Sequence, residues 1–131
     1  MQAILSRLLA DQPQFRKALK FLFISLILVG LVVALMPMRG INLDVDNADK
    51  LIHATVFFGF TLLLDLATAR SFWCWKVPLL LFYGAFIEIL QAFTPWRSFS
   101  VADFSADATG LLLYWLLWRV WLQRYLPHAN G

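Results

Sequence analysis

Four ionisable side chains lie inside or at the edge of apolar stretches of this chain: His53, Glu88, Asp103 and Asp107. A charged side chain in lipid costs roughly 3 kcal/mol or more, so a group of them at one depth indicates a site. Glu88 and Asp107 fall within apolar runs, where an unpaired carboxylate is especially costly. An imidazole and three carboxylates in one layer could transfer protons or bind a cation. These four residues are the candidate catalytic residues.

Three short motifs contain these residues, and helical spacing gives each motif a common face. They are Asp49-Lys50-x-x-His53, Glu88-x-x-Gln91 and Arg97-x-x-Ser100-x-x-Asp103-x-x-x-Asp107-x-x-Gly110. Residues four apart share a face of a helix, and a glycine there lets a neighbouring helix or a ligand approach the backbone. The remaining polar and small residues of the motifs are the candidate substrate-binding set: Asp49, Lys50, Gln91, Arg97, Ser100 and Gly110.

Each of these residues also has a structural explanation. Asp49 and Asp103 suit helix N-caps, and Ser100-x-x-Asp103 has the spacing of a capping box. Arg97 and Lys50 could reach the interface as snorkelling cations, or Arg97 could pair with Asp103. His53 could be a neutral imidazole bonded to a carbonyl. The clustering at one depth, more than any single residue, favours a functional pocket.

The charges of this predicted pocket do not balance. The acids are Asp49, Glu88, Asp103 and Asp107, and the bases are Lys50, Arg97 and a protonated His53. Either a carboxyl group is protonated and can act as an acid, or a divalent cation or a cationic ligand completes the neutralisation. Both alternatives stay open at this stage, and so does any cofactor.

The elements that must position this layer are helices. Of 131 residues, 61% are hydrophobic, 16% aromatic and only 15% charged, and the mean hydropathy is +0.71. Soluble domains rarely have this composition. Four apolar stretches can cross a membrane if flanking Lys, Arg and aromatic side chains snorkel, at about residues 21–38, 50–67, 77–94 and 103–122. The sequence therefore predicts an all-α membrane protein, a bundle of four transmembrane helices.

The helices divide the chain into an N-terminal arm, residues 1–20, a transmembrane domain, residues 21–122, and a tail, residues 123–131. Apolar residues at helical spacing near residues 4–9 predict a short amphipathic helix on the membrane interface, with a loosely ordered terminus as the alternative. The first apolar stretch offers no small-x-small cleavage site, so we expect it to remain as an anchor.

The basic residues predict the orientation. Of 11 Lys and Arg residues, eight lie in the arm, in the loop around Cys74, or at the C-terminal end from Arg119 onward. By the positive-inside rule both termini are therefore cytoplasmic, and the three motifs face the outside. The net charge of +3 reflects this topology, so we expect no nucleic-acid partner. Cys74 is the only cysteine, which excludes an intramolecular disulfide. Asp65 falls at the cytoplasmic end and is expected to pair with Arg70 or Lys76.

The ordered motif set resembles the VanZ-like family, named for a membrane protein of the teicoplanin-resistance cluster, over roughly residues 45–120. The family positions that this chain matches are Asp49, Lys50, His53, Glu88, Gln91, Arg97, Ser100, Asp103 and Gly110. The family pattern prefers Asn where this chain has Asp107, which leaves the role of that position open. The resemblance implies a multi-pass protein of the bacterial inner membrane that acts on the cell envelope and, for some members, lowers glycopeptide susceptibility. It supplies no established reaction.

Three hypotheses for function remain. The first is a pocket that binds or modifies an anionic membrane lipid or lipid-linked cell-wall precursor, with Arg97 and Lys50 on phosphate. The second is a non-enzymatic scaffold whose polar layer fixes helix packing or docks a partner. A transporter is a weaker third hypothesis, because four helices without a polar pathway at the membrane midplane are too few for transport unless the protein oligomerises. Neither an enzymatic activity nor an oligomeric state follows from the sequence.

Overall fold

The computed structural model describes residues 13–37 and 48–124, and this part of the chain is almost entirely helical. Its elements are α2 (Pro13–Leu35), α3 (Ala48–Ala67), the π-helical turn η1 (Phe72–Lys76), α4 (Val77–Ala92), α5 (Val101–Val120) and the short 3₁₀ turn η2 (Leu122–Arg124). Neither described range contains a strand. The all-α prediction is confirmed.

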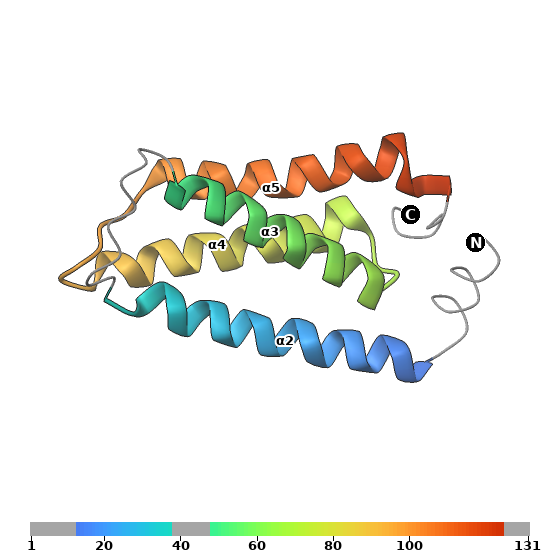
Figure 1. Ribbon diagram of the computed structural model, residues 1–131, viewed down its shortest axis with the longest axis horizontal. Helices are drawn as coiled ribbons and strands as arrows, with labels where there is room; N and C mark the ends of the chain where they lie inside the picture. Colours follow the sequence, from blue (N-terminus) through green and yellow to red (C-terminus); the bar gives the residue numbers. More distant parts are fainter. Residues whose placement is uncertain (1–12, 38–47, 125–131) are drawn as a thin grey trace.

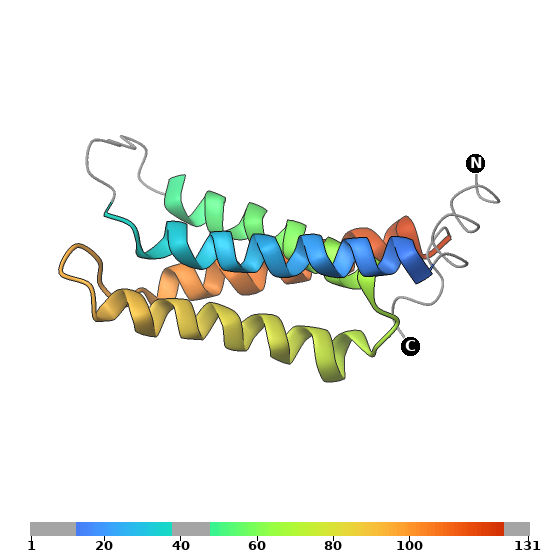
Figure 2. The same cartoon turned by 90° about the horizontal axis from the view of Figure 1, so that it is seen from below.

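The four long helices lie side by side as an up-and-down bundle (Figures 1 and 2). At one end α2 stops at Leu35, α3 starts at Ala48, α4 stops at Ala92 and α5 starts at Val101. We call this the His53 end. The opposite end, where α3 passes into η1 and α5 into η2, is called the Asp65 end. Because all three predicted motifs lie near the helix termini of the His53 end, the fold gathers them in one region.

Helices α3 and α5 form the most extensive contact of the bundle, and Gly110 permits it. A Cβ atom at Gly110 would lie 2.3 Å from the carbonyl oxygen of Ala54 and 3.0 Å from the backbone nitrogen of Phe58. No real Cβ is found that close to a backbone atom, so only glycine fits between the two helices. The predicted close approach at Gly110 is thus made by a neighbouring helix.

Three helical segments are long and apolar enough to cross a membrane: Pro13–Leu35, Ala48–Ala67 and Phe72–Ala92. Helix α5 does not meet this test, although it has 20 residues like α3, because its first turns carry Asp103, Asp107 and several small polar residues. The sequence predicted four membrane spans, and three of the described helical segments meet the test of length and composition. Helix α2 has no fully buried residue: many of its apolar side chains are exposed, whereas Phe23 and Ile27 pack against the core.

The apolar core lies midway between the two ends of the bundle. Phe57, Phe60 and Leu64 of α3 pack against Leu80 of α4 and Leu111 of α5. Aromatic rings meet edge to face within it, as Phe57 and Phe60 do with centroids 5.7 Å apart. Such pairs add about 0.5–1.5 kcal/mol beyond the area that they bury. This core separates a polar cluster at each end.

The helix limits differ from the predicted ones in two places. Helix α2 begins at Pro13, so part of the predicted arm is helical, and proline suits the first turn because its missing N–H would have no partner there. The predicted loop before α4 ends in η1, which carries Lys76 into the bundle interior. The amphipathic helix predicted near residues 4–9, the first loop and the tail at residues 125–131 lie outside the described residues.

Candidate functional site

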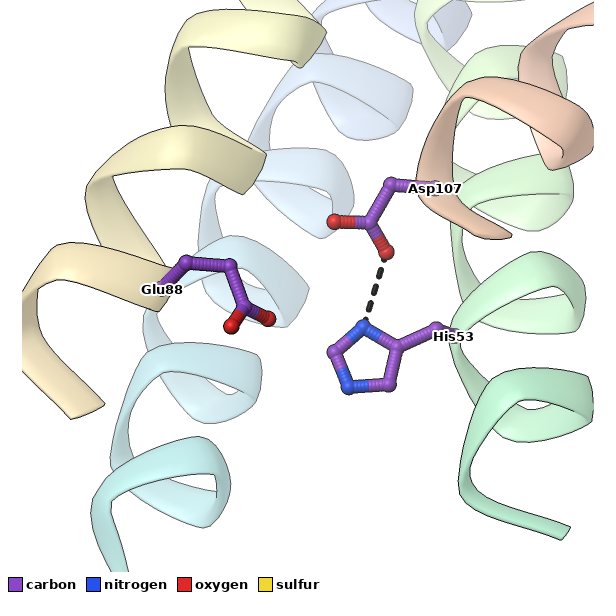
Figure 3. Close-up of side chains that lie close together, drawn as sticks. All are labelled: His53, Glu88 and Asp107. Atoms are coloured by element: carbon purple, nitrogen blue, oxygen red, sulfur yellow. Dashed lines mark hydrogen bonds and ion pairs between the residues drawn. The ribbon is translucent and has the colours of Figure 1, made fainter. Parts of the chain in front are cut away.

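The centre of the site is a contact between α3 and α5. His53 Nδ1 lies 2.8 Å from Asp107 Oδ1 (Figure 3). Asp107 is fully buried, whereas 16% of the His53 side chain is exposed. Because an ionised carboxylate only accepts hydrogen bonds, Nδ1 carries the shared proton; Nε2 is an acceptor in the neutral imidazole and a donor when His53 is protonated. The spacing of the motifs placed each residue on the right face, but it could not show that these two would meet.

Glu88 enters the site from α4 and caps the next helix. The Ser100 hydroxyl accepts a hydrogen bond from the Asp103 N–H at 3.2 Å, as expected of an N-cap. In a capping box the residue three positions later would return the bond to the N–H of the cap. Here Glu88 Oε2 accepts from the Ser100 N–H at 3.0 Å. The predicted cap is present, but a carboxylate from another helix makes its second half.

This exchange leaves the Asp103 carboxylate available to the site. Its Oδ2 lies 3.9 Å from His53 Nε2, too long for a hydrogen bond but close enough for attraction between charges when His53 is protonated. Two buried carboxylate oxygens, Glu88 Oε1 and Asp103 Oδ1, have no hydrogen-bond partner among the described residues. Leaving a buried acceptor unsatisfied costs about 1–3 kcal/mol, and more when it is charged. We call His53, Glu88, Asp103 and Asp107 the His53 cluster.

Three members of the His53 cluster converge on one point. His53, Glu88 and Asp107 each offer one ligand atom, and these atoms all lie within 4.8 Å of one another. Figure 3 shows Glu88 pointing from α4 toward the His53–Asp107 pair. An imidazole and two carboxylates from three helices form a donor set that a divalent cation can use.

Beside the cluster a cleft of about 160 Å³ runs between α2, α3 and α4. Apolar side chains form most of its wall, including Val33, Val56 and Ile87. The polar residues that line it are Asp49, His53, Gln91 and Arg97, with the Tyr83 side chain deeper along the bundle. The cleft is thus apolar along its length and charged at the His53 end.

The other predicted site residues have more local contacts. Gln91 is buried and donates from Nε2 to the carbonyl oxygen of Ala34 at 2.9 Å, which ties α4 to the end of α2. Lys50 Nζ lies 3.7 Å from Oδ1 of Asp49, its neighbour in sequence. Gly110 faces the α3 backbone, as described above. Arg97 lines the cleft, and the structure shows no ion pair between it and Asp103.

A second buried polar cluster was only partly anticipated from the sequence. Asp65 accepts from Lys76 Nζ at 2.6 Å and from the Tyr114 hydroxyl at 2.5 Å, and all three side chains are buried. The predicted pairing with Arg70 or Lys76 is resolved in favour of Lys76. The sequence did not indicate Tyr114 as a partner of Asp65, because a tyrosine among leucines and tryptophans is typical of a residue at the membrane–water interface. We call these three residues the Asp65 cluster.

Gly84 is a site residue that the sequence analysis missed. A Cβ atom there would lie 2.7 Å from Asp107 Oδ2 and 3.3 Å from the Phe57 ring. The missing side chain therefore gives the Asp107 carboxylate its space. The available signal was spacing, since Gly84 precedes Glu88 by four residues and shares its helix face.

Together, the apolar helices and the buried His53 cluster define the class of protein: an all-helical, multi-pass membrane protein with a polar site at one end. A family model for VanZ/LLP1 matches residues 5–122, almost the whole sequence. The chain belongs to the VanZ/LLP1 family. No curated protein and no solved structure matches it. The VanZ-like resemblance of the motifs is confirmed.

Proposed function

We propose that the cleft at the His53 end binds the phosphate-bearing head group of an anionic envelope lipid or lipid-linked glycan precursor. The observation that carries the proposal is the cleft's two-part lining, with apolar side chains such as Val33 and Val56 along its length and Arg97 at its charged end. An amphiphile has the same division between an acyl or prenyl chain and a polar head group. Arginine suits phosphate because its guanidinium donates two parallel hydrogen bonds.

The proposal includes a topology. Helix α5 has 20 residues and packs against α3 in the most extensive contact of the bundle, so we propose that it crosses the membrane as a fourth span. The distribution of Lys and Arg supports termini in the cytoplasm and a His53 end on the outer face of a bacterial inner membrane. A thiol reagent that cannot cross membranes should then leave Cys74 unlabelled in intact cells and label it in inverted vesicles. Labelling of intact cells from outside would contradict this orientation.

Arg97→Ala tests the head-group contact. Arg97 lies in the connection between α4 and α5, outside the apolar core, so we expect a thermal unfolding midpoint close to that of the parent. Binding of an anionic phospholipid in nanodiscs should weaken by about tenfold or more, as expected for the loss of a charge-assisted contact. Arg70→Ala, which removes a cation stacked on Trp75 outside the cleft, is the matched control and should bind as the parent does. Equal binding by all three proteins would refute the proposal.

A cellular effect follows from lipid binding. If the cleft holds a lipid-linked cell-wall precursor, Arg97→Ala should return the glycopeptide susceptibility of an expressing strain to that of a strain without the protein. Arg70→Ala should retain the phenotype of the parent. Matched protein levels in the membrane fraction are required for this comparison.

A scaffold function is the second candidate, and a specific set of contacts favours it. Polar side chains of the His53 end tie helices to one another, as in the bonds of Gln91 to Ala34 and of His53 to Asp107. Such bonds could fix helix register and nothing else. Under this alternative, Arg97→Ala would have no effect on lipid binding, and variants in the His53 cluster would lose function only as far as they lose stability.

A further inference from the structure

The His53 cluster contains more acceptors than the described residues can satisfy. Glu88 Oε1 and Asp103 Oδ1 are buried without a hydrogen-bond partner, and Glu88 is 0% exposed. A neutral His53 adds one more acceptor, Nδ1 or Nε2 according to the tautomer. None of these acceptor atoms has a positively charged partner among the described residues. A buried unpaired carboxylate is costly enough that native structures rarely retain one.

We infer that His53, Glu88 and Asp107 hold a divalent transition-metal ion, with the Asp103 carboxylate beside it. The mixed donor set of one imidazole and carboxylates selects the class of metal. Imidazole suits Zn²⁺ and its neighbours in the first transition row, whereas Mg²⁺ and Ca²⁺ prefer oxygen ligands alone. Three protein ligands leave a coordination position open, as in sites where zinc binds water or substrate.

The geometry is close to that of a bound site. Ligand atoms at about 2.0–2.1 Å from zinc lie about 3.4 Å apart in a tetrahedron. The three atoms here lie within 4.8 Å of one another, so small side-chain rotations bring them into range. The absence of a side chain at Gly84 leaves room for such a rotation, since a Cβ there would lie 2.7 Å from Asp107 Oδ2.

The ion would also resolve the charge imbalance of the lipid site. Glu88, Asp103 and Asp107 would repel a phosphate near His53, and Arg97 alone does not offset three carboxylates. A dication would, together with Arg97, balance the three carboxylates and supply a positive charge that a phosphate oxygen can bind. In this respect the inference rests on the proposed function, although metal binding itself requires no lipid.

Metal content provides the direct test. The Cys74→Ser protein, which lacks the exposed thiol, is stripped with a chelator in detergent and dialysed against Zn²⁺, Mn²⁺ or Mg²⁺ without added lipid. We expect about one tightly bound Zn²⁺ per chain and a higher unfolding midpoint with Zn²⁺ but not with equal Mg²⁺. His53→Gln and Glu88→Gln should each weaken Zn²⁺ binding by at least about tenfold.

The double variant Asp65→Asn/Lys76→Met is the control, because it removes a buried carboxylate at the other end of the bundle together with its counter-charge and leaves neither charge unpaired. It should bind Zn²⁺ as the Cys74→Ser parent does, and Asp107→Asn provides a further cluster variant if one of the others fails to fold. The inference is overturned if the Cys74→Ser parent does not bind Zn²⁺, or if the His53→Gln and Glu88→Gln variants bind it as tightly as that parent does. If Zn²⁺ does not bind but the chelated protein binds anionic phospholipid, only the metal inference fails and the proposed lipid site stands. If the protein binds neither Zn²⁺ nor the phospholipid, both proposals fail.

Discussion

The two ends of the bundle contain buried polar clusters of opposite character. Each joins α3 to α5, through Asp65 and Tyr114 at one end and through His53 and Asp107 at the other. In the Asp65 cluster both carboxylate oxygens accept a hydrogen bond, and Lys76 supplies the opposite charge. In the His53 cluster, carboxylates from α4 and α5 each keep a buried oxygen without a partner among the described residues.

We propose that this difference separates a structural cluster from a functional one. A satisfied, fully buried ion pair has no capacity left for a ligand, and its role is to fix how the helices pack. Unsatisfied acceptors at the edge of a cleft destabilise the folded protein until a ligand reaches them. Substitutions should therefore change stability at the Asp65 end and function at the His53 end.

The largest loss of stability is expected for Lys76→Met. It leaves the Asp65 carboxylate buried with Tyr114 as its remaining described side-chain partner, and breaking a buried pair from one side costs about 3–5 kcal/mol. The free energy of unfolding in mixed micelles measures this effect. The double variant Asp65→Asn/Lys76→Met removes both charges and should recover most of the loss. A single variant as stable as the parent would show that the Asp65 cluster contributes no net stability.

Gly110→Ala should follow, with a loss of about 3 kcal/mol, at the upper end of the usual cost of overpacking. The new Cβ would meet the Ala54 carbonyl oxygen at 2.3 Å, and only a separation of α3 and α5 relieves that contact. Both clusters bridge these helices, so lipid binding should fall together with stability. Gly59→Ala is the control, because nothing lies within 4 Å of its Cβ position. It should be neutral or slightly stabilising, since alanine favours the helix.

Tyr114→Phe should have a smaller effect on stability and none on lipid or Zn²⁺ binding. It removes one hydrogen bond to a carboxylate, worth about 1.5–3 kcal/mol, and keeps the ring that packs on Phe58 and Phe72. Thermal unfolding and a lipid-binding titration on the same preparation separate the two readouts. Altered ligand binding at unchanged stability would contradict the division between the two ends.

The sequence predicted the helices, and which polar side chains lie at one end of the bundle, better than it predicted the contacts between these side chains. Hydropathy located the helices, and i, i+4 spacing placed His53 and Asp107 on the faces that meet, because both depend only on local periodicity. The partner of Ser100 could not be foreseen, since Glu88 comes from another helix. Lys76 was expected in a loop, as one of two candidate partners of Asp65, whereas its complete burial and the bond of Asp65 to Tyr114 were not foreseen. Such contacts depend on tertiary packing, which one sequence without its fold does not reveal.

Glu88→Gln provides the most direct test of the central claim that the His53 cluster is a functional site. The amide oxygen can still accept from the Ser100 N–H, while a buried charge with one unsatisfied oxygen is removed. We predict that the free energy of unfolding changes by no more than about 1 kcal/mol, or rises. Binding of anionic phospholipid in nanodiscs is lost, because the proposed ion loses a ligand and the carboxylates of Asp103 and Asp107 then repel the phosphate. If Glu88→Gln instead loses several kcal/mol, as Lys76→Met should, or binds the lipid as the parent does, the His53 cluster is a structural element like the Asp65 cluster and the account is wrong.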